Sequence, residues 1–208
     1  MQYYTKKCVP TLEEAKKILE ECGKLNPGSW IEHSINVAEA AKLISENIDD
    51  LDSELAYILG LLHDIGRREG VHGIRHGLDG YNYAISKGYD LVARTCLSHT
   101  GFKYKNEVII VGKWDGTIEE YNFAKEYLSS IEEDDYDKLI RLCDYLALPL
   151  GFVLIEKRIV DIALRVGVNE YTIPRWKSTF ENKEYFEKKI GKSIYDLLPN
   201  VRENTFDM

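Results

Sequence analysis

The stretch Leu61-Leu62-His63-Asp64-Ile65-Gly66-Arg67 decides how this chain is organised. It begins as the end of an apolar helix and brings an imidazole next to a carboxylate, before Gly66 predicts the end of the helix. Histidine and aspartate are both metal ligands, and a packed helix would hold their backbone in place beside a cleft. A lone His-Asp pair also occurs by chance, so the interpretation of His63 and Asp64 depends on the rest of the chain.

The bulk composition narrows the class of protein. The 208 residues suit one domain, and a hydrophobic fraction of 44% allows a sizeable core. A net charge of −8 argues against a general nucleic-acid binder or a protein on anionic membranes, because both need excess Lys and Arg. No apolar run approaches the ~20 residues of a membrane helix, and residues 1–7 lack the apolar core of a signal peptide. We therefore expect a cytoplasmic protein with reduced cysteines, since no CxxC pair occurs among Cys8, Cys22, Cys96 and Cys143.

Apolar periodicity, capping residues and glycines predict a mostly helical chain. Thr11 and Glu14 form an expected capping box, and Gly23 predicts the end of that first helix. Ser29 and Glu32 form a second expected capping box. The expected helices cover residues 11–22, 29–47, from 52 or 53 to 66, 78–87, 90–99, 118–129, from an acidic run at 132–135 to 148, 152–166, 174–190 and 193–198.

The segments between these helices are less regular. Residues 67–77 are rich in Gly, Arg and His, and are too short and glycine-rich to be expected as a buried element. Residues 108–111 fit either a short strand or a buried turn, and residues 114–116 carry a turn signal. The acidic run at 132–135 is better explained as a solvated helix start than as a metal site. Residues 199–208 are expected to form a tail.

Two polar residues are expected on apolar helix faces. His33 lies four residues before Val37 and extends the apolar face of its helix, either as a buried hydrogen-bonded histidine or as a metal ligand. Asp144 is expected in mid-helix among apolar residues, where an unpaired carboxylate would be costly. It therefore needs a cation, and Arg141, three residues earlier, is the simplest candidate.

His33, the adjacent His63 and Asp64, and Asp144 lie on three different predicted helices. This H…HD…D order is the signature of the HD-domain superfamily of metal-dependent phosphohydrolases, and the sequence resembles a member of it. By that resemblance, the four side chains would converge on one metal ion. A divalent cation would also stabilise the carboxylate of Asp144.

The same resemblance carries expectations about the fold. It implies an all-α protein, an HD-domain helical bundle with extra C-terminal helices. The chain would form a single helical domain over residues 1–208, with an HD core at about 30–149 and a C-terminal extension at about 150–198. Because the C-terminal third has no histidine, we expect it to complete the core or to cover the cleft.

The surroundings of His76 and His99 are similar to those in HD subfamilies with a dinuclear centre. His76 precedes a Gly-x-x-Gly pattern, and His99 lies in a Ser-His-Thr-Gly stretch comparable to one in bacterial HD-type diadenosine tetraphosphate hydrolases. The resemblance implies that His76 and His99 bind a second metal and that Asp64 bridges the two ions as the catalytic carboxylate. His72 competes with His76 for this role, and all three histidines could instead be surface residues.

A site of this composition fits phosphoester chemistry. Two nearby cations polarise a phosphoryl group and lower the pKa of a bound water toward neutrality. Mixed His and carboxylate ligation suits one or two ions of Fe, Mn, Co, Ni or Zn and does not choose among them. Arg67 is the expected substrate-binding residue, because related HD proteins often carry Lys or Arg at this place. Other candidate phosphate donors, which are better explained as solvated charges, are Arg68, Arg75, Lys103 and Lys105.

The leading hypothesis is therefore a metal-dependent phosphohydrolase that acts on a small phosphorylated substrate, a nucleotide or another phosphoester. A di-iron HD-type oxygenase would use the same ligands, and a non-catalytic nucleotide-binding module would keep the site without turnover. Two motifs of other HD branches are missing: the Gly-Tyr-Pro motif of cyclic-di-GMP phosphodiesterases and the Glu-Asp pair of (p)ppGpp hydrolases. The substrate, the metal and the oligomeric state stay open.

Overall fold

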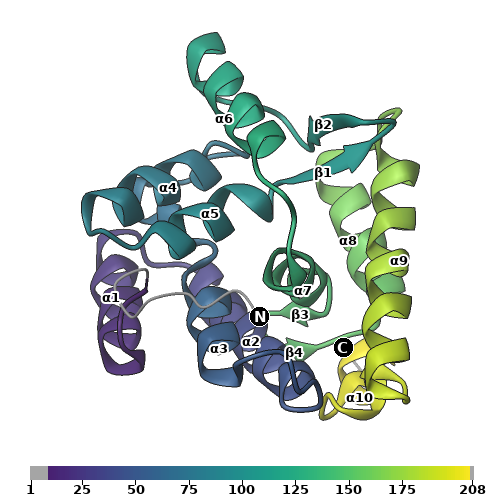
Figure 1. Ribbon diagram of the computed structural model, residues 1–208. Helices are drawn as coiled ribbons and strands as arrows, with labels where there is room; N and C mark the ends of the chain where they lie inside the picture. Colours follow the sequence, from purple (N-terminus) through teal and green to yellow (C-terminus); the bar gives the residue numbers. More distant parts are fainter. Residues whose placement is uncertain (1–8, 207–208) are drawn as a thin grey trace.

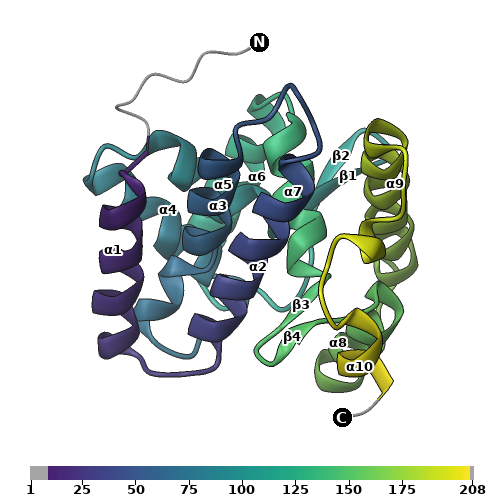
Figure 2. The same ribbon diagram turned by 90° about the horizontal axis from the view of Figure 1, so that it is seen from below.

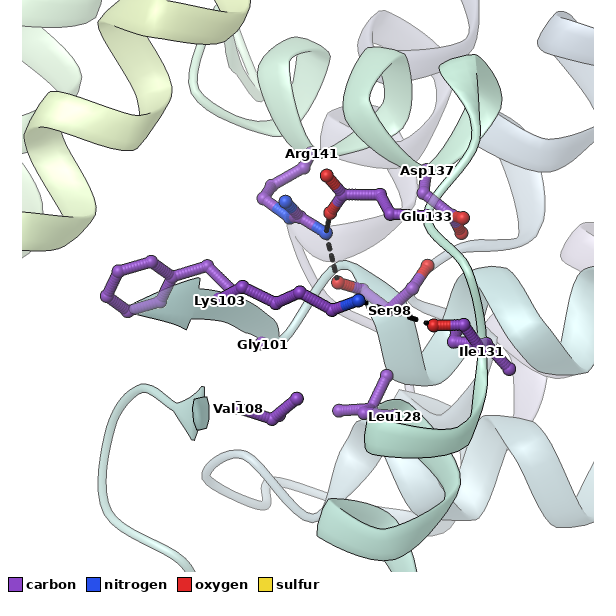
Figure 3. A pocket seen from close by; sticks show the side chains of 10 residues that line it. Ser98, Gly101, Lys103, Val108, Leu128, Ile131, Glu133, Asp137 and Arg141 are labelled. Atoms are coloured by element: carbon purple, nitrogen blue, oxygen red, sulfur yellow. Dashed lines mark hydrogen bonds and ion pairs between the residues drawn. The ribbon is translucent and has the colours of Figure 1, made fainter. Parts of the chain in front are cut away.

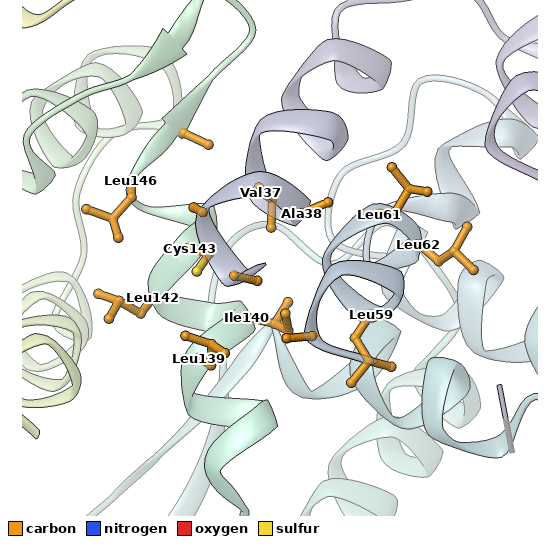
Figure 4. Packing of buried hydrophobic residues seen from close by; sticks show 14 of the residues in the cluster. Val37, Ala38, Leu59, Leu61, Leu62, Leu139, Ile140, Leu142, Cys143 and Leu146 are labelled. Carbon is orange, nitrogen blue, oxygen red and sulfur yellow. The ribbon is translucent and has the colours of Figure 1, made fainter. Parts of the chain in front are cut away.

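Helix α3 (Ser53–Leu62), which leads into the His63–Asp64 pair, packs against α2 (Trp30–Ser45) and α7 (Asp135–Asp144) in this computed structural model, which describes residues 9–206. The facing side chains of these three helices form the centre of the hydrophobic core (Figure 4). A fully buried Leu or Ile contributes about 2 kcal/mol to folding, so this packing fixes the backbone from which several polar side chains project. Fully buried members are Ile44, Leu59, Leu62, Leu139, Ile140 and Leu142.

The remaining elements surround this centre. In Figures 1 and 2, α1 and α4 lie on one side of it and α8, α9 and α10 on the other. The expected all-α class is confirmed, because the strands of the described chain form only two short hairpins. These elements are α1 (Leu12–Leu25), η1 (Ile65–Glu69), α4 (His76–Ser86), α5 (Asp90–Ser98), β1 (Gly101–Tyr104), β2 (Glu107–Ile110), α6 (Ile118–Ser130), β3 (Ala147–Leu148), β4 (Gly151–Phe152), α8 (Ile155–Val166), α9 (Thr172–Ile190), η2 (Ile194–Asp196) and α10 (Val201–Phe206).

Local capping chemistry explains where some helices begin. The Thr11 hydroxyl accepts from the Glu14 N–H while the Glu14 carboxylate accepts from the Thr11 N–H, which confirms the expected capping box. Asp52 caps α3 by accepting from two backbone N–H groups. The capping box expected at Ser29 is wrong, since this side chain makes no capping hydrogen bond within the described chain.

Glycine predicted some helix ends and not others: Gly167 and Gly191 directly follow the ends of α8 and α9 as expected, whereas Gly23 and Gly66 do not end a helix. Helix α1 continues through Gly23 to Leu25, and Gly23 is buried against the Ile31 side chain. The expected helix end at Gly66 is also wrong. Helix α3 ends at Leu62, His63 and Asp64 form the turn, and the 3-10 helix η1 follows. The pair therefore lies on a connection between two helical elements rather than on a helix.

Part of the Gly-, Arg- and His-rich segment is buried, contrary to expectation. His76 and Gly77 are buried and begin α4. A Cβ on Gly66 would overlap with the His76 carbonyl oxygen, and a Cβ on Gly77 would lie 2.8 Å from the Cys96 carbonyl oxygen. These glycines allow η1, α4 and α5 to approach closely, which brings His76 next to the His-Asp turn.

Two hairpins lie where the sequence left the structure open, at residues 108–111, or predicted helix, near residue 148. Residues 108–111 largely form β2, which pairs with β1 in the register Gly101↔Ile110 to Tyr104↔Glu107. The acidic run leads into α7 through an Asp134–Asp137 capping box, as expected for a helix start. Helix α7 ends at Asp144, not at residue 148, because the chain turns there into the β3–β4 hairpin. For the same reason α8 begins later than the expected residue 152.

The C-terminal segment contains a helix where a tail was expected. Residues 193–198 contain η2, and α10 follows within the expected tail, with Val201 buried in the main core. Cys22, Cys96 and Cys143 are free thiols, while Cys8 and residues 1–7 lie outside the described residues. Among the helices of residues 9–206, none is both long and apolar enough to cross a membrane.

Candidate metal centre

Six side chains from five separate parts of the fold form one cluster. His33 comes from the first turn of α2, His63 and Asp64 from the turn after α3, His76 from the start of α4, His99 from the end of α5 and Asp144 from the end of α7. The four histidines and Asp64 are buried, whereas the Asp144 side chain is 21% exposed. The sequence had placed His33, the His63–Asp64 pair and Asp144 on three different helices, and the structure brings all six side chains together.

The ligand atoms form two groups that share Asp64. His33, His63 and Asp64 make one group, and Asp64, His76 and His99 make the other; within each group these atoms lie within 4.8 Å of one another. Asp144 adjoins the first group, with its Oδ1 3.0 Å from His33 Nε2. In the second group, Asp64 Oδ1 lies 2.9 Å from His76 Nε2 and 3.5 Å from His99 Nε2. This arrangement has the composition and spacing of a two-metal site with a shared carboxylate.

The outer nitrogens of three histidines fix how the rings face the cluster. Nδ1 of His63 lies 2.7 Å from the Gly60 carbonyl, Nδ1 of His76 lies 2.5 Å from the Gly73 carbonyl and Nδ1 of His99 lies 3.2 Å from the Thr95 carbonyl. A carbonyl oxygen only accepts, so each Nδ1 must donate its N–H. In a neutral ring this leaves a lone pair on Nε2, as metal ligation requires.

These lone pairs converge without a donor between them. Nε2 of His76 lies 3.2 Å from Nε2 of His99, and both approach the Asp64 carboxylate. His63 Nε2 is buried and has no hydrogen-bond partner among the described residues. Burial lowers the pKa of His63 to about 3, against the opposite effect of Asp64, so this ring is neutral at pH 7. With each Nδ1 donating to a backbone carbonyl, the Nε2 atoms and the Asp64 carboxylate face one another as acceptors, an arrangement that a cation among them stabilises. The residues present therefore fit a metal ion.

Two arginines lie against the two carboxylates. Arg67 Nε donates to Asp64 Oδ2 over 2.6 Å, and Arg158 Nη2 lies 3.5 Å from Asp144 Oδ1. Burial opposes the charge on Asp64, but Arg67 outweighs it and holds the Asp64 pKa well below its usual range. Burial likewise opposes the charge on Asp144, and His33 and Arg158 hold that pKa low as well.

The expected pairing of Asp144 with Arg141 is wrong. Arg141 lies 2.5 Å from a Glu133 carboxylate oxygen and donates to the Ser98 carbonyl, while Asp144 is the last residue of α7 and points to His33. The cation beside Asp144 is Arg158, from α8. Sequence spacing could not identify this pairing, because the two residues belong to elements that meet only after the β3–β4 hairpin.

The cluster opens into a cleft of about 920 Å³. Its lining includes the metal-ligand candidates His33, Asp64 and His76, and elements from the C-terminal part, which therefore cover the cleft as expected. Aromatic side chains on its walls are Trp30, Tyr145 and Trp176, and positive charges along it are Arg67, Lys113, Arg158, Arg165 and Arg175.

Of the phosphate donors considered from the sequence, Arg67 lines this cleft. Arg68 packs instead on the Tyr83 ring, and Arg75 pairs with Asp79 and Glu120. His72, the alternative to His76, also lines the cleft but lies beside Asp115, at 3.8 Å, rather than beside Asp64. The geometry therefore favours His76 over His72 as a neighbour of the shared carboxylate.

Lys103 lines a different and much smaller pocket. Figure 3 shows it beside Ser98, Glu133 and Arg141, where its Nζ donates to the Ile131 carbonyl over 3.5 Å. The room in this pocket is about 20 Å³, enough for about one water molecule. Lys103 thus lies outside the large cleft.

Two arginines at the cleft were missed from the sequence. Arg175 is buried and donates to the carbonyls of His99 and Gly101 and to the Tyr145 hydroxyl, so it holds α9 against the end of α5. Arg158 lies against Asp144 as described above. The amphipathic pattern of residues 152–166 predicted a packed helix but gave no signal for the contact of Arg158 with Asp144.

The fold and the cluster define the class of protein. The HD domain family matches residues 30–148, more than half of the chain, and the chain belongs to this family, whose members bind divalent metals. The chain is also 30% identical over 168 residues to the uncharacterized protein MJ0778 of Methanocaldococcus jannaschii. The aligned region covers 78% of this chain and 92% of that protein. No solved structure matches the chain.

Proposed function

We propose that this protein is a metal-dependent phosphohydrolase that cleaves a nucleotide or another small phosphoester or phosphoanhydride. The observation that carries the proposal is the convergence of the His63, His76 and His99 Nε2 atoms around the buried carboxylate of Asp64. The HD family includes metal-dependent phosphohydrolases, which supports this class of reaction.

In this proposal His33, His63, Asp64 and Asp144 would hold one divalent ion, and Asp64, His76 and His99 a second. When bound, the ions would polarise the phosphoryl group and lower the pKa of a coordinated water toward neutrality. The backbone carbonyls behind the three histidines keep their Nε2 lone pairs directed at this position. Asp64 is held ionised beside Arg67, as a ligand shared by both groups must be.

The cleft supports a substrate with an organic group attached to the phosphate. A volume of about 920 Å³ is far larger than a phosphate ion requires. Arg67 would bind phosphoryl oxygens, and the half-buried Trp176, which lines the same cleft, would offer an aromatic ring on which a base can stack. A cytoplasmic location and the absence of nucleic-acid and membrane partners also belong to this proposal.

The first experiment is elemental analysis of protein purified without chelators, combined with phosphate release from a panel of nucleotides and phosphoesters. The wild type is expected to contain one to two equivalents of a divalent metal and to release phosphate. The His63→Ala and Asp64→Ala variants are expected to lose both properties, while Lys103→Ala, outside the cleft, keeps them.

Full activity in His63→Ala and Asp64→Ala would contradict the proposal, as would a wild-type protein that binds no metal even after reconstitution. Oxygen consumption by iron-loaded protein without phosphate release would support the oxygenase alternative. Nucleotide binding without any product would support the non-catalytic module.

A further inference from the structure

Arg158 comes from a helix that lies outside residues 30–148, the part matched by the HD family. Its side chain, 12% exposed, reaches from α8 to the end of α7 and lines the same cleft as Arg67. An arginine from the C-terminal extension thus lies against the last carboxylate of the candidate metal centre.

The guanidinium group of Arg158 is held by two contacts besides Asp144 Oδ1. Its Nε lies 3.4 Å from the main-chain oxygen of Asp144, and its Nη1 lies 3.4 Å from Asp161 Oδ2. Neither acceptor is among the candidate metal ligands. Because neither contact uses the Asp144 carboxylate, both can hold the guanidinium group while that carboxylate engages a cation.

Arg67 has the corresponding position at the other carboxylate. It donates to Asp64, and its side chain is 31% exposed toward the cleft. Both arginines therefore line one cleft, Arg67 beside Asp64 and Arg158 beside Asp144. Two guanidinium groups beside the carboxylates of one candidate metal centre match a phosphoryl group, because its oxygens accept charge-assisted hydrogen bonds from several directions.

Other arginines near the cleft have different surroundings. The nitrogens of Arg175 donate to two carbonyls and a hydroxyl and its guanidinium lies over Phe102 and Tyr145, which makes it a structural residue. Arg165 is 55% exposed at the rim and pairs with Asp161. It shares a helix and a carboxylate partner with Arg158 but lacks the contact with Asp144, so it provides a matched control.

We propose that Arg158 is a phosphate-binding residue that contacts the substrate's phosphoryl oxygens together with Arg67. The inference rests on the proposed function, since it assumes that the metal centre binds phosphate. It assigns to the C-terminal extension a direct role in the site rather than only a covering one.

The test is inorganic phosphate binding to the metal-loaded full chain, measured by calorimetry, with metal content measured on the same samples. Arg158→Gln is expected to weaken phosphate binding roughly 10- to 100-fold at unchanged metal content, which is the range for losing a charge-assisted hydrogen-bonding partner. Arg158→Lys is expected to recover part of this loss, because it restores charge but not the planar guanidinium. Arg165→Gln is expected to leave phosphate affinity within about 2-fold, as for an exposed ion pair.

A purely supporting role for Arg158 makes a different prediction. If Arg158 only neutralised Asp144, Arg158→Gln would lose metal, and its phosphate affinity would fall only through that loss; either this result or unchanged phosphate affinity overturns the inference. If Arg158→Gln fails to fold by circular dichroism, Arg158→Lys decides, and phosphate affinity equal to wild type overturns the inference.

The outcomes also separate this inference from the proposed function. Hydrolysis by the wild type together with unchanged phosphate affinity in Arg158→Gln overturns the role of Arg158 and leaves the hydrolase in place. Weakened phosphate binding at full metal content supports Arg158 even if the wild type hydrolyses nothing. A metal-loaded wild type that binds no phosphate overturns the role of Arg158.

Discussion

At the scale of single residues, His72 and His76 offer a test of the second metal position. Nε2 of His76 lies 2.9 Å from Asp64, whereas the acidic partner of His72 is Asp115. His76→Ala is therefore expected to lower the metal content by about one equivalent, because the second group loses one of its three side chains. Elemental analysis of both variants checks this.

His72→Ala is the control, since it removes an imidazole from the same cleft and is expected to leave the metal content unchanged. Full metal content in His76→Ala, or an equal loss in both variants, would contradict a second ion at His76 and His99.

Gly66 determines how closely η1 approaches α4. A Cβ at this position would overlap with the carbonyl oxygen of His76 and the backbone nitrogen of Gly80, and backbone atoms cannot move aside as a flexible side chain does. Gly66→Ala is expected to destabilise the fold by about 3 kcal/mol, at the upper end for overpacking, and to displace His76 from Asp64. Urea unfolding measures the first effect and metal content the second.

The matched control is Gly23→Ala in α1. There the added Cβ meets only the end of the Ile31 side chain, and alanine favours a helix over glycine by up to about 1 kcal/mol. Equal losses of stability in Gly66→Ala and Gly23→Ala would show that the backbone approach at Gly66 is not the cause.

The sequence was most informative about residues with their own chemistry. The candidate ligands could be named because histidines and aspartates followed a recognisable order, and the structure brings His33, His63, Asp64, His76, His99 and Asp144 into one cluster. Arg158 and Arg175 could not be named, because an arginine on an amphipathic helix is normally a solvated charge. Their contacts depend on elements that are distant in the chain.

At the scale of elements, α5 and α7 are joined by a buried ion pair. Arg94 on α5 donates twice to the carboxylate of Asp137, which is 2% exposed. Burial opposes the charge on Asp137, but Arg94 outweighs it and the pKa is lowered. A lowered pKa stabilises the fold above the unfolded value of about 3.9, and this contribution is lost as the pH falls through the folded value.

Arg94→Ala is therefore expected to cost about 3 kcal/mol at pH 7, because it leaves a buried carboxylate without its cation. The difference from wild type should narrow as the pH falls toward the lowered pKa of Asp137 in the wild-type fold, because a protonated carboxyl no longer needs the cation. Urea midpoints between pH 7 and pH 3 test this. Lys17→Ala breaks an exposed pair with Glu21 and should change nothing at either pH, and a pH-independent loss in Arg94→Ala would refute the ion-pair explanation.

Elements were predictable where a local signal decided them. Helix α1 begins where its capping box predicts, and α6 occupies the expected 118–129 region. The ends of α3 and α7 were not predictable, because the apolar periodicity continues past them and tertiary packing ends the helices. Gly66 allows close packing against α4, so its presence in the sequence did not indicate the end of a helix.

At the scale of the whole molecule, the cleft is lined both by the HD core and by the C-terminal helices that follow it in the sequence. The HD core supplies the six-residue cluster, while residues of α8 and of the start of α9 also line the cleft. Arg175 joins the two by donating from α9 to the carbonyl of His99. The metal centre therefore lies at the junction between core and extension, and ordering one should order the other.

Metal binding should consequently stabilise the entire fold. An ion that binds only the folded state stabilises it by RT ln(1 + [L]/Kd), about 4 kcal/mol at a thousandfold excess over Kd. For a domain of this size that corresponds to a Tm increase of roughly 8 to 16 °C. Differential scanning fluorimetry of chelator-treated protein, before and after addition of excess manganese, measures the shift.

The decisive comparison is Asp64→Asn, which keeps the shape of the side chain but removes the charge shared by both ligand groups. Its Tm should respond only weakly to manganese. The direct effect of the substitution on Tm is measured in the presence of chelator. Without metal, the uncharged asparagine no longer repels the Nε2 lone pairs of the histidines, but it also loses the ion pair with Arg67. An equal manganese-dependent rise in Asp64→Asn and wild type would locate the binding elsewhere and remove the physical basis for a metal at this cluster.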